Sequence, residues 1–173
     1  MGTTGRNWAC EHFDVKPDLV AFGKKVQVCG VIAGPRLDEV KDNCFRMPSR
    51  LNSTWGGNFT DMVRSKHYLQ IVEEENLVEN AARVGARIVK ALEEIAAECS
   101  MISAVRGRGL FIAFDLPDAE TRDKVWKNLY EAGLLVLKSG ERAIRFRPAL
   151  DLTPEVADEA MALVRAQCGK NQS

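Results

Sequence analysis

Three short stretches of this sequence carry residue types that could do chemistry together. Residues 18–27 predict a short apolar strand that ends by presenting Lys24. A lysine at the end of a buried strand loses solvation, which favours the neutral amine, a nucleophile able to form an imine with an aldehyde. Residues 53–58 place hydroxyl groups beside two glycines, and residues 144–148 contain two arginines. Together the stretches suggest an imine-forming lysine, a phosphate site and a carboxylate clamp.

Each of these residues also has a simpler structural explanation. A lone lysine is far more often a solvated surface charge than a nucleophile, and Lys25 competes with Lys24 for the role. The stretch 53–58 could be an ordinary loop ahead of a helix. Arg145 and Arg147 could each bind a carboxylate, and Arg147 could instead be the partner of a surface or structural acid.

The composition argues against several classes of function. Hydrophobic residues make up 46% and charged residues 28%, as in folded globular proteins. The 24 basic residues balance 24 acidic ones, so no basic excess predicts a nucleic-acid partner. No apolar run approaches the length of a membrane span, and the first residues lack the apolar core of a signal peptide. We therefore expect a cytoplasmic protein without nucleic-acid or membrane partners.

The cysteines and histidines do not predict a metal site. The five cysteines are scattered, odd in number and never spaced as C-x-x-C, and the sequence has only two histidines. We expect reduced, mostly buried thiols. The cysteines are Cys10, Cys29, Cys44, Cys99 and Cys168.

The first 75 residues predict part of an α/β sheet followed by a helix. The apolar runs 19–23 and 28–33 are of strand length, and their continuous apolar character fits strands covered on both faces. Two strands cannot form such a sheet alone, so we expect them to leave an apolar patch exposed in this chain, which favours association. A short helix could form at 5–13. From Phe59 the apolar residues follow a helical period, and the acidic stretch 73–76 is most simply the solvated end of that helix.

The residues from about 76 onward predict a compact α+β unit, with strands covered by helices on one side. Apolar residues recur at helical spacing from 77 to 95. Thr153 and Pro154 are suited to the N-cap and the first position of a last helix. The other expected elements are a turn at 105–110, strands at 111–115, 134–137 and 143–146, and a helix at 118–131.

Four motifs of this sequence resemble the class III (omega) pyridoxal-phosphate aminotransferases. Residues 17–24 (PDLVAFGK) resemble the lysine motif of the family, and residues 53–58 (STWGGN) resemble its S-T-[FYW]-G-G-N segment. Residues 106–110 (RGRGL) and 144–150 (IRFRPAL) match its two C-terminal signatures. The motifs occur in the order of the family and cover essentially the whole chain.

The resemblance implies a fold and a division into domains. The expected fold class is α/β and α+β, the C-terminal part of a fold-type I pyridoxal-phosphate transferase. Residues 1–58 would be a remnant of the large cofactor-binding domain, residues 59–75 a connecting helix, and residues 76–173 the small C-terminal α+β domain.

The resemblance also implies a role for each matched residue. Lys24 would hold pyridoxal 5'-phosphate and then move a proton between substrate and cofactor. Thr54 would bind the cofactor phosphate from across a dimer interface, with Ser53 as a neighbour on the cofactor side and Asn52 on the substrate side. Arg145 would clamp the carboxylate of glutamate or 2-oxoglutarate with its guanidinium fork.

Residues 22–30 and 48–55 are similar to the L-lysine 6-aminotransferase branch of the family. That branch implies transfer of the terminal amino group of L-lysine to 2-oxoglutarate, giving 2-aminoadipate 6-semialdehyde and glutamate. The 4-aminobutyrate aminotransferases share the double lysine and the R-F-R-P element, so another omega-amino donor stays open. Arg106 and Arg108, beside glycines, are more often structural than substrate contacts.

Three features of the family precede the matched region. They are an acidic residue paired with the pyridine nitrogen, a small-residue phosphate loop and an aromatic residue stacked on the ring. We therefore expect a C-terminal fragment, with Met1 an internal methionine or the start of a truncated frame, of an enzyme that is a homodimer at full length. We expect negligible transaminase activity from this chain alone. A non-catalytic, dimerising α+β remnant is the alternative outside enzymes.

Overall fold

The computed structural model describes residues 1–54 and 56–169, which form two compact units. The first unit contains Met1 and Trp8–Glu75, and the second contains Gly2–Asn7 and the chain from Asn76 onward. The division falls within the acidic stretch 73–76, whose residues are exposed, as the sequence predicted for a solvated helix end.

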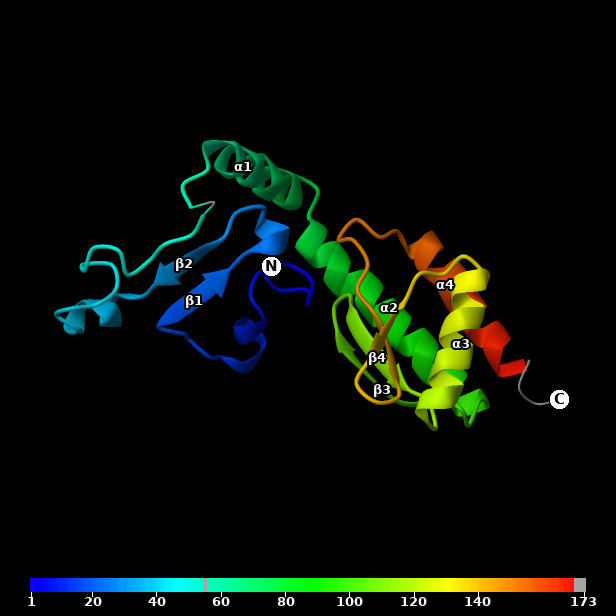
Figure 1. Cartoon of the computed structure of the whole chain (residues 1–173). Coiled ribbons are helices and arrows are strands. Elements are labelled where there is room, and N and C mark those ends of the chain that lie inside the picture. The colour runs from blue at the N-terminus through cyan, green and yellow to red at the C-terminus, as the bar shows by residue number, and fades with distance from the viewer. Residues whose placement is uncertain (55, 170–173) are drawn as a thin grey trace. The chain divides into compact units, whose positions relative to one another are not determined.

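The first unit is built around a two-stranded antiparallel sheet and one long helix (Figure 1). The two strands pair from Leu19 opposite Ala33 to Phe22 opposite Gly30. The elements are the 3-10 helices η1 (Ala9–Phe13), η2 (Lys24–Val26) and η3 (Pro35–Glu39), the strands β1 (Leu19–Phe22) and β2 (Gly30–Ala33), and the helix α1 (Phe59–Glu74).

The two strands are not covered on both faces within the described chain. No residue of β1 or β2 is fully buried, and Leu19, Val31 and Ile32 are exposed. The expected exposed apolar patch at these strands is confirmed. Gly30 is required by local packing, since a β-carbon there would lie 2.5 Å from the ring of Phe22.

Helix α1 begins where the sequence predicted and exposes most of its apolar side chains. The side chain of Asn58 caps the helix by accepting hydrogen bonds from the backbone N–H groups of Thr60 at 3.0 Å and Asp61 at 3.4 Å. Of the predicted apolar face only Val72 is buried, whereas Phe59 is 81% exposed. The first unit therefore presents a large apolar surface of its own.

The second unit is a four-stranded antiparallel sheet covered by helices (Figure 1). The strand order is β3-β4-β6-β5. Helix α2 packs on β3 and β4, α3 packs on β5 and β6, and α4 packs on α2 and α3. These elements are α2 (Leu77–Glu98), β3 (Ser103–Arg108), β4 (Phe111–Asp115), α3 (Ala119–Glu131), β5 (Leu137–Ser139), β6 (Ala143–Phe146) and α4 (Pro154–Gly169).

Two predicted boundaries in this unit are wrong. Most of the stretch 105–110 belongs to strand β3, which pairs with β4 from Arg106 opposite Ala113 to Arg108 opposite Phe111. Its glycines and arginines indicated a turn, but an edge strand that faces solvent tolerates polar residues. The turn is restricted to Gly109 and Leu110.

Strand β5 begins at Leu137 rather than at Leu134. The backbone of the preceding residues is held by helix α3. The Leu134 N–H donates to the carbonyl of Leu129 at 2.8 Å, and the indole N–H of Trp126 donates to the carbonyl of Val136 at 2.9 Å. These bonds to the helix occupy groups that a longer strand would need for the sheet.

The core of the second unit lies between one face of the sheet and the helices. Ile112 and Phe114 of β4 are buried, and they pair across the sheet with Phe146 and Ile144 of β6. Side chains alternate between the two faces of a strand, so these four lie on the same face. The buried apolar residues of α2 match the predicted helical period and are Ala81, Val84, Ile88, Leu92 and Ile95.

Residues near the N-terminus complete the second unit. The N–H of Leu110, at the β3–β4 turn, donates to the carbonyl of Thr3 at 2.8 Å. A β-carbon on Gly5 would lie 2.7 Å from the side chain of Ala82 in α2, so glycine is needed for this close approach. Residues 2–7 therefore pack with a part of the chain that follows them by more than seventy positions.

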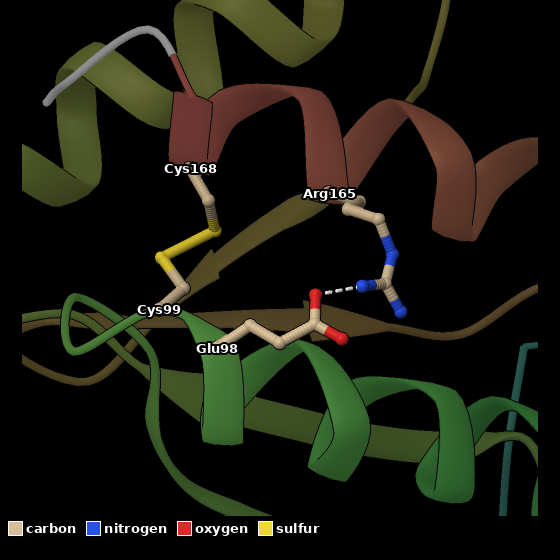
Figure 2. The surroundings of a disulfide bond; sticks show 4 residues. All are labelled: Glu98, Cys99, Arg165 and Cys168. Carbon is tan, nitrogen blue, oxygen red and sulfur yellow. Dashed lines mark hydrogen bonds and ion pairs between the residues drawn. A yellow bond between two sulfur atoms is a disulfide. The ribbon is translucent and has the colours of Figure 1, made fainter.

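Two cysteines form a disulfide bond, which corrects the expectation of reduced, mostly buried thiols. Cys99 follows α2 and Cys168 lies in the last turn of α4, and the bond joins these helix ends (Figure 2). The pairing spans 69 positions, so spacing gave no signal for it. The three free cysteines are half-buried or exposed and are Cys10, Cys29 and Cys44.

We predict that truncation of Phe114 strongly destabilises the second unit. Phe114 is fully buried, so Phe114→Ala should cost about 3–5 kcal/mol of unfolding free energy, measured by urea denaturation. Phe111→Ala is the matched control on the same strand. Phe111 is 46% exposed, and its loss should cost less than about 1 kcal/mol. Equal losses would contradict the assignment of the core face.

We predict an acid-dependent contribution from the ion pair between α2 and α4. Arg87 donates Nε and Nη2 to the two oxygens of Asp158, each at 2.6 Å, and these hydrogen bonds lower the pKa of Asp158. A lowered folded-state pKa stabilises the fold above the unfolded pKa of about 3.9, and this stabilisation is lost as the pH falls through the folded value.

Arg87→Gln should therefore lower the urea midpoint at pH 6, and its difference from the unchanged chain should shrink toward pH 3. Arg83→Gln is the control on the same helix, since Arg83 donates to the neutral side chain of Asn80. A constant difference between Arg87→Gln and the unchanged chain across this range would contradict the prediction.

Candidate functional site

Lys24 is the first residue of η2 and is exposed. This corrects the expectation of a desolvated lysine at the end of a buried strand, because β1 ends at Phe22 and its sheet is itself solvated. Lys25, the rival candidate, is half-buried in the same turn. The turn is closed by the N–H of Gln27, which donates to the carbonyl of Lys24 at 2.9 Å.

The backbone of Lys24 adopts an unfavourable conformation. Its φ of 53° lies in the left-handed region, which costs a residue with a β-carbon of order 1 kcal/mol or more. The neighbouring Gly23 packs tightly, since a β-carbon there would lie 2.9 Å from the sulfur of Cys29. A positive φ is not peculiar to Lys24, because Gln27 of the same turn and four other described non-glycine residues also have one.

Asn52, Ser53 and Thr54 lie together on an exposed loop ahead of α1. A turn follows, in which the N–H of Gly56 donates to the carbonyl of Ser53 at 3.0 Å. The tryptophan of the motif, Trp55, lies outside the described residues. The Thr54 side chain is exposed on this loop.

The backbone N–H groups at the beginning of α1 are already partly occupied. Two of its first backbone N–H groups, those of Thr60 and Asp61, already donate to the side chain of Asn58. An anion would have to displace this cap to reach them. A phosphate at this loop would therefore depend mainly on the Thr54 hydroxyl.

Arg145 lies on the open face of the second unit's sheet. Its register partners are Ala113 of β4 and Leu137 of β5, and its neighbours in the strand, Ile144 and Phe146, point to the opposite, helix-covered face. The Nε atom of Arg145 is buried and has no hydrogen-bond partner among the described residues. A buried N–H without a partner is costly, and a bound carboxylate would supply one.

The other arginines near this face differ in their partners. Arg147 is exposed beyond the end of β6, and within the described ranges no acid forms an ion pair with it, contrary to the expected structural pairing. Arg106 lies 2.8 Å and Arg142 3.7 Å from the carboxylate of Asp115. The prediction that Arg106 is structural fits this pairing.

The pairing with Asp115 was missed from the sequence. The residue is the last of β4 and lies opposite Ser103 and Ala143 in the register. The sequence did contain a usable signal. In β4 the buried residues Ile112 and Phe114 alternate with residues on the other face of the strand, and Asp115 is an acid at one of those other positions. Arg106 Nη2 is close enough for an ion pair, although its orientation does not satisfy a hydrogen bond to Oδ1.

An apolar cavity of about 300 Å³ lies beside Arg145. It is lined by residues 134–137, residues 145–148, Ile88 of α2, Leu152 and the first half of α4, so much of its wall lies on the helix-covered side of the sheet. Most of these side chains are aliphatic, so Arg145 and Arg147 are the charged groups of the lining. The cavity could take the carbon chain of a small carboxylate whose charged end meets a guanidinium.

The predicted site residues are thus distributed between the two units. Lys24, Asn52, Ser53 and Thr54 belong to the first, and Arg145 belongs to the second. In residues 1–54 and 56–169, no three histidine, cysteine or acidic side chains lie close enough together to bind a metal. No helix in these ranges has the length and apolar character to span a membrane.

The sequence matches the family model of the class III aminotransferases over residues 1–166. It is 49% identical to an L-lysine-epsilon aminotransferase of Mycobacterium tuberculosis, over 95% of this chain and 37% of the relative. The L-lysine-epsilon aminotransferase of Streptomyces clavuligerus is 44% identical over 92% of this chain and 35% of its own length. The chain thus spans little more than a third of these relatives.

A solved structure gives the same result. The lysine aminotransferase of M. tuberculosis in the internal aldimine form superposes with a TM-score of 0.90 at 49% identity, covering 95% of this chain and 38% of that one. The chain belongs to the class III aminotransferases, which are pyridoxal-phosphate-dependent enzymes of mixed helix and sheet architecture. The resemblance inferred from the four motifs is confirmed, as is its nearness to the lysine aminotransferases.

Proposed function

We propose that this chain acts within an aminotransferase that moves the terminal amino group of L-lysine to 2-oxoglutarate, giving 2-aminoadipate 6-semialdehyde and glutamate. The names of the relatives support the amino donor. The observation in the structure that carries the proposal is Arg145, whose buried Nε has no hydrogen-bond partner within residues 1–54 and 56–169. A dicarboxylic acceptor would satisfy that donor with one of its carboxylates.

Lys24 is the residue that we propose holds the cofactor. Pyridoxal phosphate, when bound, supplies an aldehyde and an electron-withdrawing ring. The exposed amine of Lys24, on a strained turn, is accessible to that aldehyde. When the Lys24 amine is no longer bonded to the cofactor, it would move a proton between the substrate carbon and the cofactor carbon. Thr54 would hold the phosphate, with Ser53 beside it and Asn52 toward the substrate.

The apolar surface of the first unit supports assembly with further protein. Phe59, Met62 and Val63 on α1 are exposed, as are Leu19 and Ile32 on the sheet. A surface of this kind normally contacts another polypeptide. We propose that the enzyme is a cytoplasmic homodimer in which Thr54 reaches the cofactor phosphate across the interface, and that the 173-residue chain alone has negligible activity.

Two alternatives remain. The 4-aminobutyrate aminotransferase of Sus scrofa is 34% identical over 86% of this chain, which keeps an omega-amino donor other than lysine as the second candidate. A dimerising remnant without catalysis is the other, supported by the exposed apolar face of α1. Attachment of the cofactor at a single lysine would distinguish an aminotransferase, whether its donor is lysine or 4-aminobutyrate, from a dimerising remnant without catalysis.

We predict that the cofactor attaches selectively at Lys24. The chain would be incubated with pyridoxal phosphate and reduced with borohydride, and the labelled lysine would be located by peptide mass spectrometry. Lys24→Ala should remove most of the label, and Lys25→Ala, the adjacent control, should retain it. A label spread evenly over the surface lysines, from a chain that light scattering shows to be a dimer, would instead support the non-catalytic remnant.

We predict that Arg145 binds the acceptor carboxylate. Arg145→Lys keeps the charge but loses the fork, and it should weaken the binding of 2-oxoglutarate, measured by an NMR titration, roughly 10- to 100-fold. Arg147→Lys is the matched control two positions along and should change the affinity less than about threefold. Equal effects, with unchanged urea midpoints for both variants, would contradict the role of Arg145.

A further inference from the structure

The disulfide between Cys99 and Cys168 lies where two helices end (Figure 2). Cys99 is the C-cap of α2 and is 4% exposed, whereas Cys168, in the last turn of α4, is half-buried. The two α-carbons are 5.8 Å apart, a separation typical of disulfides. No backbone rearrangement is therefore needed to join or separate the sulfurs.

A second interaction joins the same two helix ends. Glu98 precedes Cys99, and its carboxylate pairs with Arg165, one turn before Cys168 (Figure 2). Both side chains are substantially exposed, so this ion pair contributes little by itself. The first half of α4 is held independently, by the Arg87–Asp158 pair and by the buried Ala157.

We propose that Cys99 and Cys168 are a reversible redox site that fastens the last turns of α4 to the end of α2. The reducing environment of the cytoplasm keeps most protein thiols reduced, and disulfides that form in cytoplasmic proteins are usually transient and responsive to oxidants. The oxidised chain has the end of α4 fixed, and the reduced chain holds it by the exposed ion pair and by side-chain packing. This inference rests on the cytoplasmic location proposed above and not on transamination.

The oxidation requires a small disulfide such as oxidised glutathione. The Cys168 thiolate, the more accessible of the two, attacks the small disulfide, forms a mixed disulfide and releases one thiol. The Cys99 thiolate then attacks the sulfur of Cys168, which forms the protein disulfide and releases the second thiol. Two protein thiols are oxidised, one small disulfide is reduced to two thiols, and the two protein protons pass to the released thiolates.

The site is tested by counting thiols in the full 173-residue chain across a series of reduced-to-oxidised glutathione ratios. Native alkylation and peptide mass spectrometry would measure the fraction that links Cys99 to Cys168. We expect this fraction to rise from below about a tenth to above about nine-tenths across the series. A link that never forms, or one that persists at the most reducing ratio, would overturn the proposal.

The structural consequence is tested by limited trypsin digestion and thermal unfolding. Reduction should speed cleavage after Arg165 about tenfold, because the last turns of α4 open more often, and leave cleavage after the exposed Arg36 unchanged. The oxidised chain should melt roughly 5–15 °C higher.

Cys168→Ser should abolish the dependence of both measurements on the glutathione ratio. Cys29→Ser, which removes an exposed free cysteine, should preserve that dependence. Equal cleavage after Arg165 in the oxidised and reduced chain would show that the bond does not fasten the helix and would overturn that part of the proposal.

Discussion

The alternation of side chains along β4 and β6 is the constraint on which the second unit depends. Ile112, Phe114, Ile144 and Phe146 bury one face of the sheet beneath the helices. Because successive residues of a strand point to opposite faces, the same packing directs Arg145 to the other face. A shift of one residue in the register would bury the guanidinium and expose Phe146. The position of the proposed carboxylate-binding group is thus a consequence of the core.

The first unit lacks a comparable constraint. Its two strands are solvated, and α1 buries only Ser65 and Val72. Local interactions hold its shape instead, such as the Asn58 cap and the turn that closes on Lys24. The residues proposed to bind the cofactor lie on this unit, and the proposed partner subunit would fix their geometry by covering its exposed apolar face.

Much of the second unit and of the family assignment could be predicted from the sequence. Helical periodicity placed α2, and Thr153 and Pro154 placed the beginning of α4, because these signals are local. The extent of β3 could not be predicted because its pairing with β4 decides it. The beginning of β5 could not be predicted because hydrogen bonds with α3 hold the residues before it. The Cys99–Cys168 bond joins residues that only the tertiary fold brings together. Lys24, Thr54 and Arg145 are proposed as site residues from the motifs, whereas the exposure of Lys24 could be seen only in the three-dimensional arrangement.

The packing of residues 2–7 has a consequence for the path of the chain. Gly2 and Gly5 lie against Val78 and Ala82, at the start of α2. The segment 8–75 therefore leaves the second unit and returns to it near the same helix, as an insertion does in a host domain. The chain on each side of this segment belongs to the second unit. A proteolytic cut within the segment 8–75 would therefore leave the second unit made of two polypeptides, one containing residues 2–7 and the other the residues from 76 onward. A tag fused directly ahead of Gly2 would adjoin the host domain in space as well as in sequence.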